Sequence, residues 1–181
     1  NLNIAKRVTY NAKLRNSAIC GATETILIHE KVIKKFGNQI LKSLEEGGCK
    51  IIGDNKIRSF YSREIQKASI KDWSKEYLDS IVSVKSVKNI DQAIQHINKY
   101  GTMHTDCIIT QNKKSAKKFL SEVKSSIAMH NTSTQFADGG EFGFGGEVGI
   151  STSSLPPRGP VGLKQLVSYK YIISSNGKIR N

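Results

Sequence analysis

Cys20 is the residue of this sequence with the clearest chemical potential. It stands in the stretch SAICGATET, residues 17–25, just ahead of a run, TILIH, that is typical of a strand. Its small neighbours Ala18, Gly21 and Ala22 leave room for a substrate carbonyl to approach the sulfur. Junctions between strands and helices are also where α/β enzymes place their sites. The pattern is compatible with a thiolate nucleophile, and an inert loop or core cysteine explains it more simply.

A catalytic thiol acts as its thiolate and needs a lowered pKa. Lys13 and Arg15 lie close to Cys20 in sequence and are the cations that could lower it. Cys49 and Cys107 stand in short apolar runs, where a small buried side chain is the simplest interpretation. Three cysteines without metal-ligand spacing predict neither a disulfide framework nor a metal site, and they indicate the reducing cytoplasm.

A glycine-rich segment, GGEFGFGG at residues 139–146, is the second feature that could carry chemistry. Repeated glycines expose backbone N–H groups, which can hold a carboxylate or a phosphate. The segment does not match the dinucleotide-binding pattern, because no helix clearly begins on it after a strand. A tight packing loop explains the same glycines equally well.

Alternating strands and helices predict an α/β fold with a largely parallel sheet flanked by helices. The expected helices cover residues 4–16, 30–48, 89–101 and 112–124. The expected strands cover residues 24–29, 49–53, 77–87, 105–110 and 126–131. Each helix has one apolar stripe, which must pack on a face of the sheet.

The composition narrows the class of protein. The net charge of +13 is compatible with nucleic acid, an anionic surface or acidic substrates. Lysines on solvated helix faces explain it more simply, since even the densest patch, QNKKSAKKF, keeps helical apolar spacing. We expect no membrane association, because no apolar stretch approaches the roughly 18–20 residues that span a bilayer.

Three blocks of the sequence together resemble gamma-glutamyl phosphate reductase, a member of the aldehyde dehydrogenase superfamily. They are NAKLRNSAICGATETILIH, HINKYGTMHTDCIIT and NTSTQFADGGEFGFGGEVGIST, the last followed by RGPVGLKQLVSYKYI. The similarity runs from about Asn11 to Arg180 and corresponds to the C-terminal, catalytic part of the family. The resemblance implies an aldehyde dehydrogenase-like catalytic domain with a C-terminal oligomerisation-type strand.

The resemblance also implies a reaction. The substrate would be L-glutamyl 5-phosphate, and the thiolate at the Cys20 position would attack it and release phosphate. NADPH would then reduce the thioester, which yields glutamate 5-semialdehyde for proline biosynthesis. The family places Glu76 at the ribose on the nicotinamide side of the cofactor. The residues that would border the glutamyl carboxylate or the thioester are Asn131, Ser133, Thr134, Gly139 and Gly140.

Two departures of the sequence from the family bear on its chemistry. Gln135 stands where relatives usually have Arg, so a fixed positive charge is lost from a loop expected to meet an anionic substrate. In addition, the earlier part of the family's chain has no counterpart in this sequence. That part supplies most of the dinucleotide fold, the phosphate-binding turn and the Asn of the oxyanion hole. A hydride donor would therefore be held poorly by these residues alone.

Three regions follow: a catalytic α/β domain at 1–131, a glycine-rich active-site loop region at 132–162, and a helical turn and strand at 163–181. The strand expected at SYKYIIS, residues 168–174, would lack a neighbouring strand in this chain. Such a strand favours pairing with another chain, so we expect a homo-oligomer.

Three functions stay open. They are a reductase completed by a separate N-terminal half, a folded but inactive remnant, and a basic nucleic-acid-binding protein.

Overall fold

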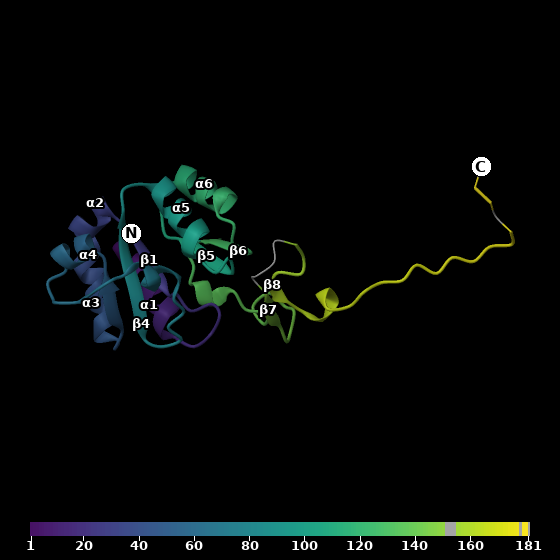
Figure 1. Cartoon of the computed structure of the whole chain (residues 1–181), viewed down its shortest axis with the longest axis horizontal. Helices are drawn as coiled ribbons and strands as arrows, with labels where there is room; N and C mark the ends of the chain where they lie inside the picture. Colours follow the sequence, from purple (N-terminus) through teal and green to yellow (C-terminus); the bar gives the residue numbers. More distant parts are fainter. Residues whose placement is uncertain (151–154, 178, 181) are drawn as a thin grey trace.

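A four-stranded parallel sheet forms the core of the compact α/β part of the molecule, on the left in Figure 1. The structure, a computed structural model, describes residues 1–150, 155–177 and 179–180. In spatial order the strands are β1 (Thr25–His29), β4 (Ile81–Val87), β2 (Lys50–Gly53) and β3 (Gln66–Lys67). All three pairings are parallel, so crossover helices must connect the strands. The predicted α/β fold with a largely parallel sheet is confirmed.

Two smaller sheets accompany the central one. β5 (Thr105–Ile108) and β6 (Ile127–His130) form a parallel pair. β7 (Val148–Ile150) and β8 (Gly159–Val161) form an antiparallel pair within the glycine-rich region, which sequence reasoning treated as an irregular loop. Glycine and proline masked this pairing, because both residues are depleted in strands.

All but one of the described α-helices begin at a side chain that caps them. The α-helices are α1 (Leu2–Leu14), α2 (Glu30–Val32), α3 (Asn38–Glu46), α4 (Asn55–Phe60), α5 (Ile90–Tyr100) and α6 (Lys113–Glu122). Asp54, Asn89 and Asn112 each accept a hydrogen bond from a backbone N–H three residues ahead, which satisfies a donor that the first helical turn leaves free. Short 3₁₀ turns occupy Ile70–Ser74, Thr134–Phe136 and Leu163–Gln165.

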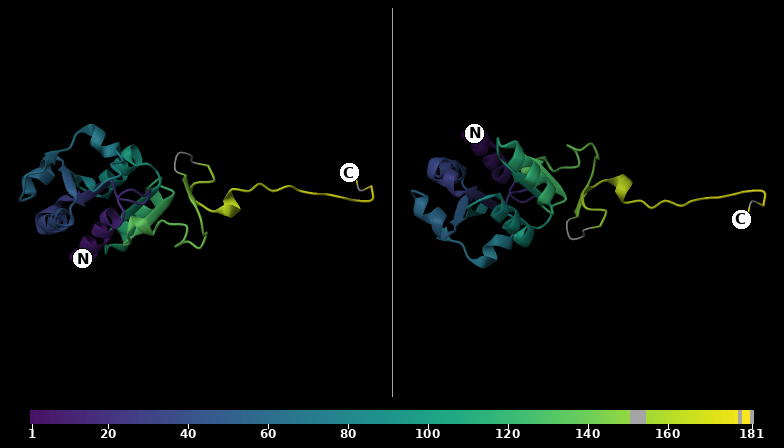
Figure 2. Two further views of the ribbon diagram at one scale, coloured as in Figure 1. Left: turned by 90° about the horizontal axis from the view of Figure 1, so that it is seen from below. Right: turned by 90° about the horizontal axis from the view of Figure 1, so that it is seen from above.

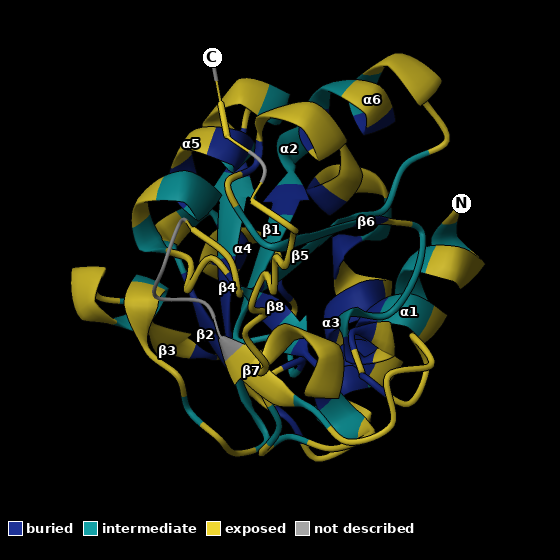
Figure 3. Cartoon of the chain, turned by 90° about the vertical axis from the view of Figure 1, so that its right-hand side faces the viewer, coloured by how far each residue is buried: buried dark blue, intermediate teal, exposed yellow. Residues whose placement is uncertain are grey.

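Two layers of helices cover the sheets. α1 packs on α3, and α5 packs on α6. The larger core cluster lies between α3, α4 and the central sheet, and the smaller one joins α5 and α6 through Ile94, Phe119 and Val123. Leu44, Ile57, Val82 and Val84 are fully buried in the larger cluster. Figure 3 shows the buried residues concentrated in these strands and the inward faces of the helices.

Three local predictions were incomplete or wrong. The helix expected over 30–48 is interrupted by a π-helical turn at Ile33–Gly37. The weakly patterned stretch before β4 contains α4 and the short β3, which are too brief for periodicity to reveal. The strand expected over 168–174 is not formed. An isolated strand is unstable without a partner, and no described strand pairs with these residues.

The C-terminal tail leads away from the rest of the molecule (Figures 1 and 2). Its apolar side chains are exposed, with relative exposures of 81% for Tyr171, 86% for Ile172 and 90% for Ile173. An extended apolar segment of this kind favours pairing with another chain. Within the described ranges, no helix has the length and apolar character needed to cross a membrane.

We predict that the chain self-associates through this tail. The double variant Ile172→Lys, Ile173→Lys should sediment as a smaller species than the parent, because two charges oppose strand pairing in an apolar interface. Ile70→Lys, at an exposed position within the α/β domain, should sediment like the parent and serves as the control. A parent chain that remains monomeric at high concentration in sedimentation velocity would contradict the prediction.

Candidate active site

Cys20 lies in the turn between α1 and β1, and its side chain is exposed. The 3₁₀ turn at Thr134–Phe136 packs directly on this turn. A Cβ added at Gly21 would lie 2.9 Å from the carbonyl oxygen of Thr134, so only glycine permits this approach. The hydroxyl groups of Thr23 and Thr134 are also hydrogen-bonded at 3.0 Å. The structure therefore places Thr134 beside Cys20.

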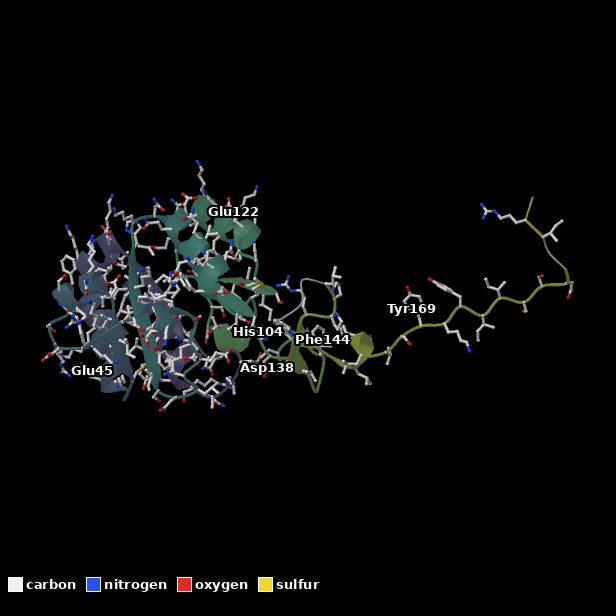
Figure 4. All side chains as sticks on the ribbon, viewed as in Figure 1. Glu45, His104, Glu122, Asp138, Phe144 and Tyr169 are labelled. Carbon is white, nitrogen blue, oxygen red and sulfur yellow. The ribbon has the colours of Figure 1, made fainter. Side chains whose placement is uncertain are left out.

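His104 and Gly149 approach Cys20 from the other side. A Cβ added at Gly149 would lie 3.8 Å from the Cys20 sulfur and 3.1 Å from Nε2 of His104. The thiol and the imidazole thus both lie within 4 Å of one point beside the β7–β8 pair. Figure 4 shows His104 and Asp138 where the α/β domain meets this pair. Three segments far apart in sequence converge here, and of Cys20, His104 and Gly149 the sequence analysis pointed only to Cys20.

His104 is a site residue that sequence reasoning missed. It is buried, and within the described chain its Nε2 atom has no hydrogen-bond partner. Its Nδ1 atom shares a 2.8 Å hydrogen bond with the Thr105 hydroxyl. Burial lowers the pKa of His104, which keeps the ring neutral at pH 7, and the charge of Glu76 opposes this shift only in part. The signal in the sequence that could have identified His104 was its position directly before a predicted strand.

The electrostatic surroundings of Cys20 disfavour the thiolate. Burial raises the pKa of the thiol above its ordinary value of 9.0, and the negative charges of Glu147 and Asp138 add to this shift. The backbone N–H groups of Gly21 and of Cys20 itself lower the pKa and offset part of the increase. The resting thiol is therefore protonated at neutral pH, so its attack requires a proton acceptor.

The cations proposed to activate Cys20 have other partners. Lys13 is fully buried and forms a 2.8 Å ion pair with Glu24. Arg15 donates from Nη1 to Oε1 of Gln135 at 3.3 Å. The charges that act on the thiol are instead those of Glu147 and Asp138. The expectation that Lys13 and Arg15 could lower the pKa of Cys20 finds no support in this arrangement.

Gln135 does not face the substrate side of the loop as expected. Its side chain is buried, and its Nε2 atom donates to the carbonyl oxygens of Ala12 at 2.9 Å and Asn16 at 3.1 Å. The residue ties the 3₁₀ turn to the end of α1. The guanidinium of Arg15 also lies beside it, so a positive charge is retained next to this loop.

The remaining predicted loop residues are spread along the loop. Asn131 adopts a φ of 58°, and its side-chain amide exchanges two 2.9 Å hydrogen bonds with the backbone of Thr110 beyond the end of β5. Ser133 caps the 3₁₀ turn through its hydroxyl, which accepts from the Gln135 N–H. These two side chains have structural partners, and their contact with substrate stays a prediction.

Gly139 and Gly140 lie next to the acidic side of the site. A Cβ on Gly139 would lie 2.7 Å from Cβ of Glu147, so the loop can pass there only without a side chain. Gly140 donates its N–H to the Asp138 carboxylate at 2.8 Å and is exposed. Burial, and secondarily the charge of Asp138, raise the pKa of Glu147. These glycines border Glu147 and Asp138, which act on the Cys20 thiol.

Glu76 is exposed and lines the same cavity as Cys20 and Thr134. The cavity has a volume of about 860 Å³ and extends from the site along β1 and β5. Cys20 precedes β1 and His104 precedes β5, so the site lies at the amino ends of these strands. This differs from the usual location at the carboxyl ends of strands in open α/β sheets, on which sequence reasoning relied.

A family model gives the class of the protein. The model described as the aldehyde dehydrogenase family matches residues 66–170. The chain belongs to the aldehyde dehydrogenase family. An acetylating aldehyde dehydrogenase from Geobacillus thermoglucosidasius shares the fold, with a TM-score of 0.65 at 13% identity over all of this chain and 49% of the other.

Within that family the chain is similar to gamma-glutamyl phosphate reductases. The one from Clostridium beijerinckii is 49% identical over 177 residues, which are 98% of this chain and 42% of the relative. The one from Bartonella tribocorum is 48% identical over 179 residues, 99% of this chain and 43% of the relative. The resemblance predicted from the three sequence blocks is confirmed, and the chain spans less than half the length of these relatives.

A solved structure supports the same relationship. The gamma-glutamyl phosphate reductase of Thermotoga maritima superposes with a TM-score of 0.93 at 42% identity. The match covers all of this chain and 44% of that one.

We predict that Cys20 reacts with iodoacetamide faster than the other cysteines. Cys49 is buried and its pKa is raised to about 11, while Cys107 is half-buried and donates to a carbonyl oxygen of the Thr132 backbone. The Cys20 rate should keep rising above pH 9.0, the ordinary thiol pKa, because burial raises the pKa of Cys20 above that value. Mass spectrometry of the labelled peptides gives the three rates. Equal rates would show that Cys20 is not the accessible thiol.

The variant Glu147→Gln should raise the Cys20 labelling rate at about pH 8 by roughly threefold. Removing the negative charge lowers the thiol pKa, and half a pKa unit changes the thiolate fraction by about that factor. Glu141→Gln alters an exposed carboxylate of the same loop and should leave the rate unchanged. A slower reaction in Glu147→Gln would contradict the assigned electrostatics.

Gly21→Ala should destabilise the chain by about 1–3 kcal/mol. The new Cβ would meet two backbone atoms, the Thr134 carbonyl oxygen and the Gln135 Cα, which cannot rotate away as a side chain would. Gly146→Ala is the matched control, since a Cβ there meets nothing within 4 Å. Urea unfolding measures both variants, and equal stability of the two would disprove the close packing of the loop.

Proposed function

We propose that this chain is the catalytic-cysteine part of a gamma-glutamyl phosphate reductase, acting in proline biosynthesis in the cytoplasm. The enzyme would reduce L-glutamyl 5-phosphate to glutamate 5-semialdehyde. The observation that carries the proposal is the convergence of exposed Cys20 with His104 and Gly149. The residues that converge there belong to a stretch that is 49% identical to such a reductase.

The first chemical step can be assigned to residues of this chain. The Cys20 thiolate attacks the acyl carbon, a C–S bond forms, the C–O bond to phosphate breaks, and phosphate leaves with the electron pair. The thiol proton must first be removed, because the pKa of Cys20 is raised. Neutral His104 is our candidate acceptor, directly or through one water molecule, since its Nε2 has no other described partner.

The developing negative charge on the acyl oxygen also needs hydrogen-bond donors. The N–H groups of Gly21 and Cys20 already face the sulfur and are the donors that this chain can offer. Thr134, Gly139 and Gly140 would border the bound substrate beside Cys20. Asn131 and Ser133 would hold the loop that carries these residues in place, through their hydrogen bonds to the surrounding backbone.

NADPH is the expected hydride donor, but the described residues fit only part of it. Exposed Glu76 borders the cavity that contains Cys20, as a contact to the ribose on the nicotinamide side requires. Within the described ranges, no glycine-rich turn follows a strand and opens a helix to hold the diphosphate. The chain alone therefore binds the cofactor poorly, and the hydride step needs further protein.

A separate N-terminal portion would supply that protein. The alternative is a folded chain without activity, and the specific observation in its favour is the raised pKa of Cys20. The nucleic-acid-binding alternative depends on the net charge of +13 alone. The two leading hypotheses differ in whether the chain catalyses the reaction once an N-terminal portion is added.

We predict that the chain reduces L-glutamyl 5-phosphate when it is mixed with the N-terminal portion of the Clostridium beijerinckii relative. NADPH oxidation, coupled to formation of glutamate 5-semialdehyde, measures the rate. Cys20→Ser should abolish activity, and His104→Asn should lower kcat by about 10²–10⁴-fold, as expected for loss of a general base. Exposed His130→Asn is the control and should keep the parent rate.

Two outcomes would overturn the proposal. A mixture that forms a complex but does not reduce the substrate would favour the hypothesis that the chain is folded but inactive. A Cys20→Ser variant that retains activity would show that another group carries the acyl intermediate.

A further inference from the structure

Arg158 is a charged side chain that joins the β7–β8 pair to the α/β part of the molecule. It directly precedes Gly159, the first residue of β8. Its Nε atom donates to the hydroxyl of Ser126 at 2.7 Å, and its Nη2 atom donates to the carbonyl oxygens of Lys124 at 2.6 Å and Met103 at 3.3 Å. A planar guanidinium can serve acceptors along two edges at once, and hydrogen bonds from a charged donor are the stronger ones. Arg158 therefore ties β8 to the segments that lead into β5 and β6.

The carbonyl oxygen of Met103 is the point at which these contacts meet. It accepts from the backbone N–H of Ser126 at 2.9 Å and from the Ser126 hydroxyl at 3.3 Å, in addition to Arg158. Met103 has a φ of 63°, a conformation that a residue other than glycine adopts only when its surroundings enforce it. This oxygen belongs to the same peptide group as the N–H of His104. The donors that hold it therefore fix the backbone immediately before the imidazole.

The close approach of β8 to the start of β6 depends on Gly159. This residue has a φ of 79°, and a Cβ added to it would lie 3.2 Å from Cβ of Ser126. Glycine suits both conditions, because it has no Cβ and tolerates a positive φ. Gly159 pairs with Ile150 in the β7–β8 ladder, and Ile150 directly follows Gly149. An anchor at Arg158 therefore also sets where Gly149 lies.

Gly149 of β7 lies beside both the thiol and the imidazole of the candidate site. A Cβ at this position would lie 3.8 Å from the Cys20 sulfur and 3.1 Å from Nε2 of His104. Arg158 acts on both sides of this meeting point. Through the Met103 carbonyl it holds the segment that carries His104, and through β8 it holds the strand that carries Gly149. A displacement at either end would change the distance between the sulfur and the imidazole.

We infer that Arg158 is a positioning residue, which holds His104 and the β7–β8 pair in the arrangement that directs the imidazole toward Cys20. The catalytic consequence rests on the proposed function, because it depends on His104 as the proton acceptor. Burial and the charge of Glu76 are what act on the pKa of His104, so the role of Arg158 is geometric rather than electrostatic. A catalytic group displaced by about 1 Å can lose on the order of 100-fold in rate.

Histidine titration by NMR tests the geometry in the chain alone, without substrate. The variant Arg158→Lys keeps the positive charge but lacks the two donor edges of the guanidinium, so the imidazole should become more hydrated. Because burial lowers the pKa of His104, hydration should raise that pKa toward its ordinary value of 6.5. The signal of His104 is the one that His104→Asn lacks. Lys164→Ala removes an exposed cation of the same C-terminal region and should leave the titration unchanged.

Ser126→Ala is a second and milder variant. It removes the hydroxyl that accepts from Nε of Arg158 and donates to the Met103 carbonyl, and it leaves the guanidinium in place. The pKa of His104 should rise in this variant as well, by less than in Arg158→Lys. Circular dichroism and urea unfolding of each variant separate a local change from loss of the fold, and Ser126→Ala decides the matter if Arg158→Lys does not fold.

A double-mutant comparison separates positioning from general stability. In the chain mixed with the N-terminal portion of the Clostridium beijerinckii relative, Arg158→Lys should lower kcat by about 10-fold to 100-fold and change KM by less than about twofold. In the His104→Asn background the same substitution should have little further effect, because its action passes through the imidazole. A general loss of stability would instead lower activity by the same factor in both backgrounds.

Two results would overturn the inference. One is an unchanged pKa of His104 in both Arg158→Lys and Ser126→Ala. The other is a fall in kcat that is equal in the parent and in the His104→Asn background. If the mixture has no activity, a raised pKa of His104 in the two variants would support the positioning role and would count against the proposed function alone.

Discussion

The buried amide of Gln135 is the interaction on which the geometry of the candidate site depends. A buried amide is costly unless its donors and acceptor are paired, and here three contacts satisfy it. It bonds to the carbonyl oxygens of Ala12 and Asn16 and accepts from Arg15, so the end of α1 is fixed against the 3₁₀ turn. The Cys20 turn begins immediately after these residues. Displacing this amide would move the thiol relative to Thr134 and His104.

The same contact changes the effect expected of Gln135, which stands where relatives usually have Arg. An Arg at this position would bring a charge, whereas Gln135 receives a hydrogen bond from the guanidinium of a neighbouring residue. The loop keeps its attachment to α1, and the positive charge lies at Arg15 instead. Fixed geometry and chemical activation are separate properties, however. The site is assembled in this chain, while burial and two carboxylates keep Cys20 protonated.

Local patterns in the sequence predicted most of the fold. Apolar periodicity placed α5 and α6 within two residues of their observed ends, because this signal acts over a few residues. The short β3 and the β7–β8 pair were missed, because β3 is too brief to show a period and because glycine and proline are depleted in strands. The π-helical turn at Ile33–Gly37 leaves the apolar spacing almost unchanged and so left no signal.

The candidate site was predicted only in part for the same physical reason. Cys20 was identified from its small neighbours, but the necessity of Gly21 arises from a backbone 113 positions away. His104 acquires its role through burial and through a meeting with Gly149, neither of which a linear pattern contains. The location of the site at the amino ends of the strands likewise follows from tertiary packing.

The central claim is that Cys20 accepts the acyl group of the substrate. Its most direct test is peptide mass spectrometry on the chain mixed with the N-terminal portion of the Clostridium beijerinckii relative and with L-glutamyl 5-phosphate, NADPH being withheld. Without the hydride donor the thioester should accumulate, and the account predicts a glutamyl adduct on the peptide that contains Cys20. An adduct spread equally over Cys20, Cys49 and Cys107, or no adduct at all, would contradict it.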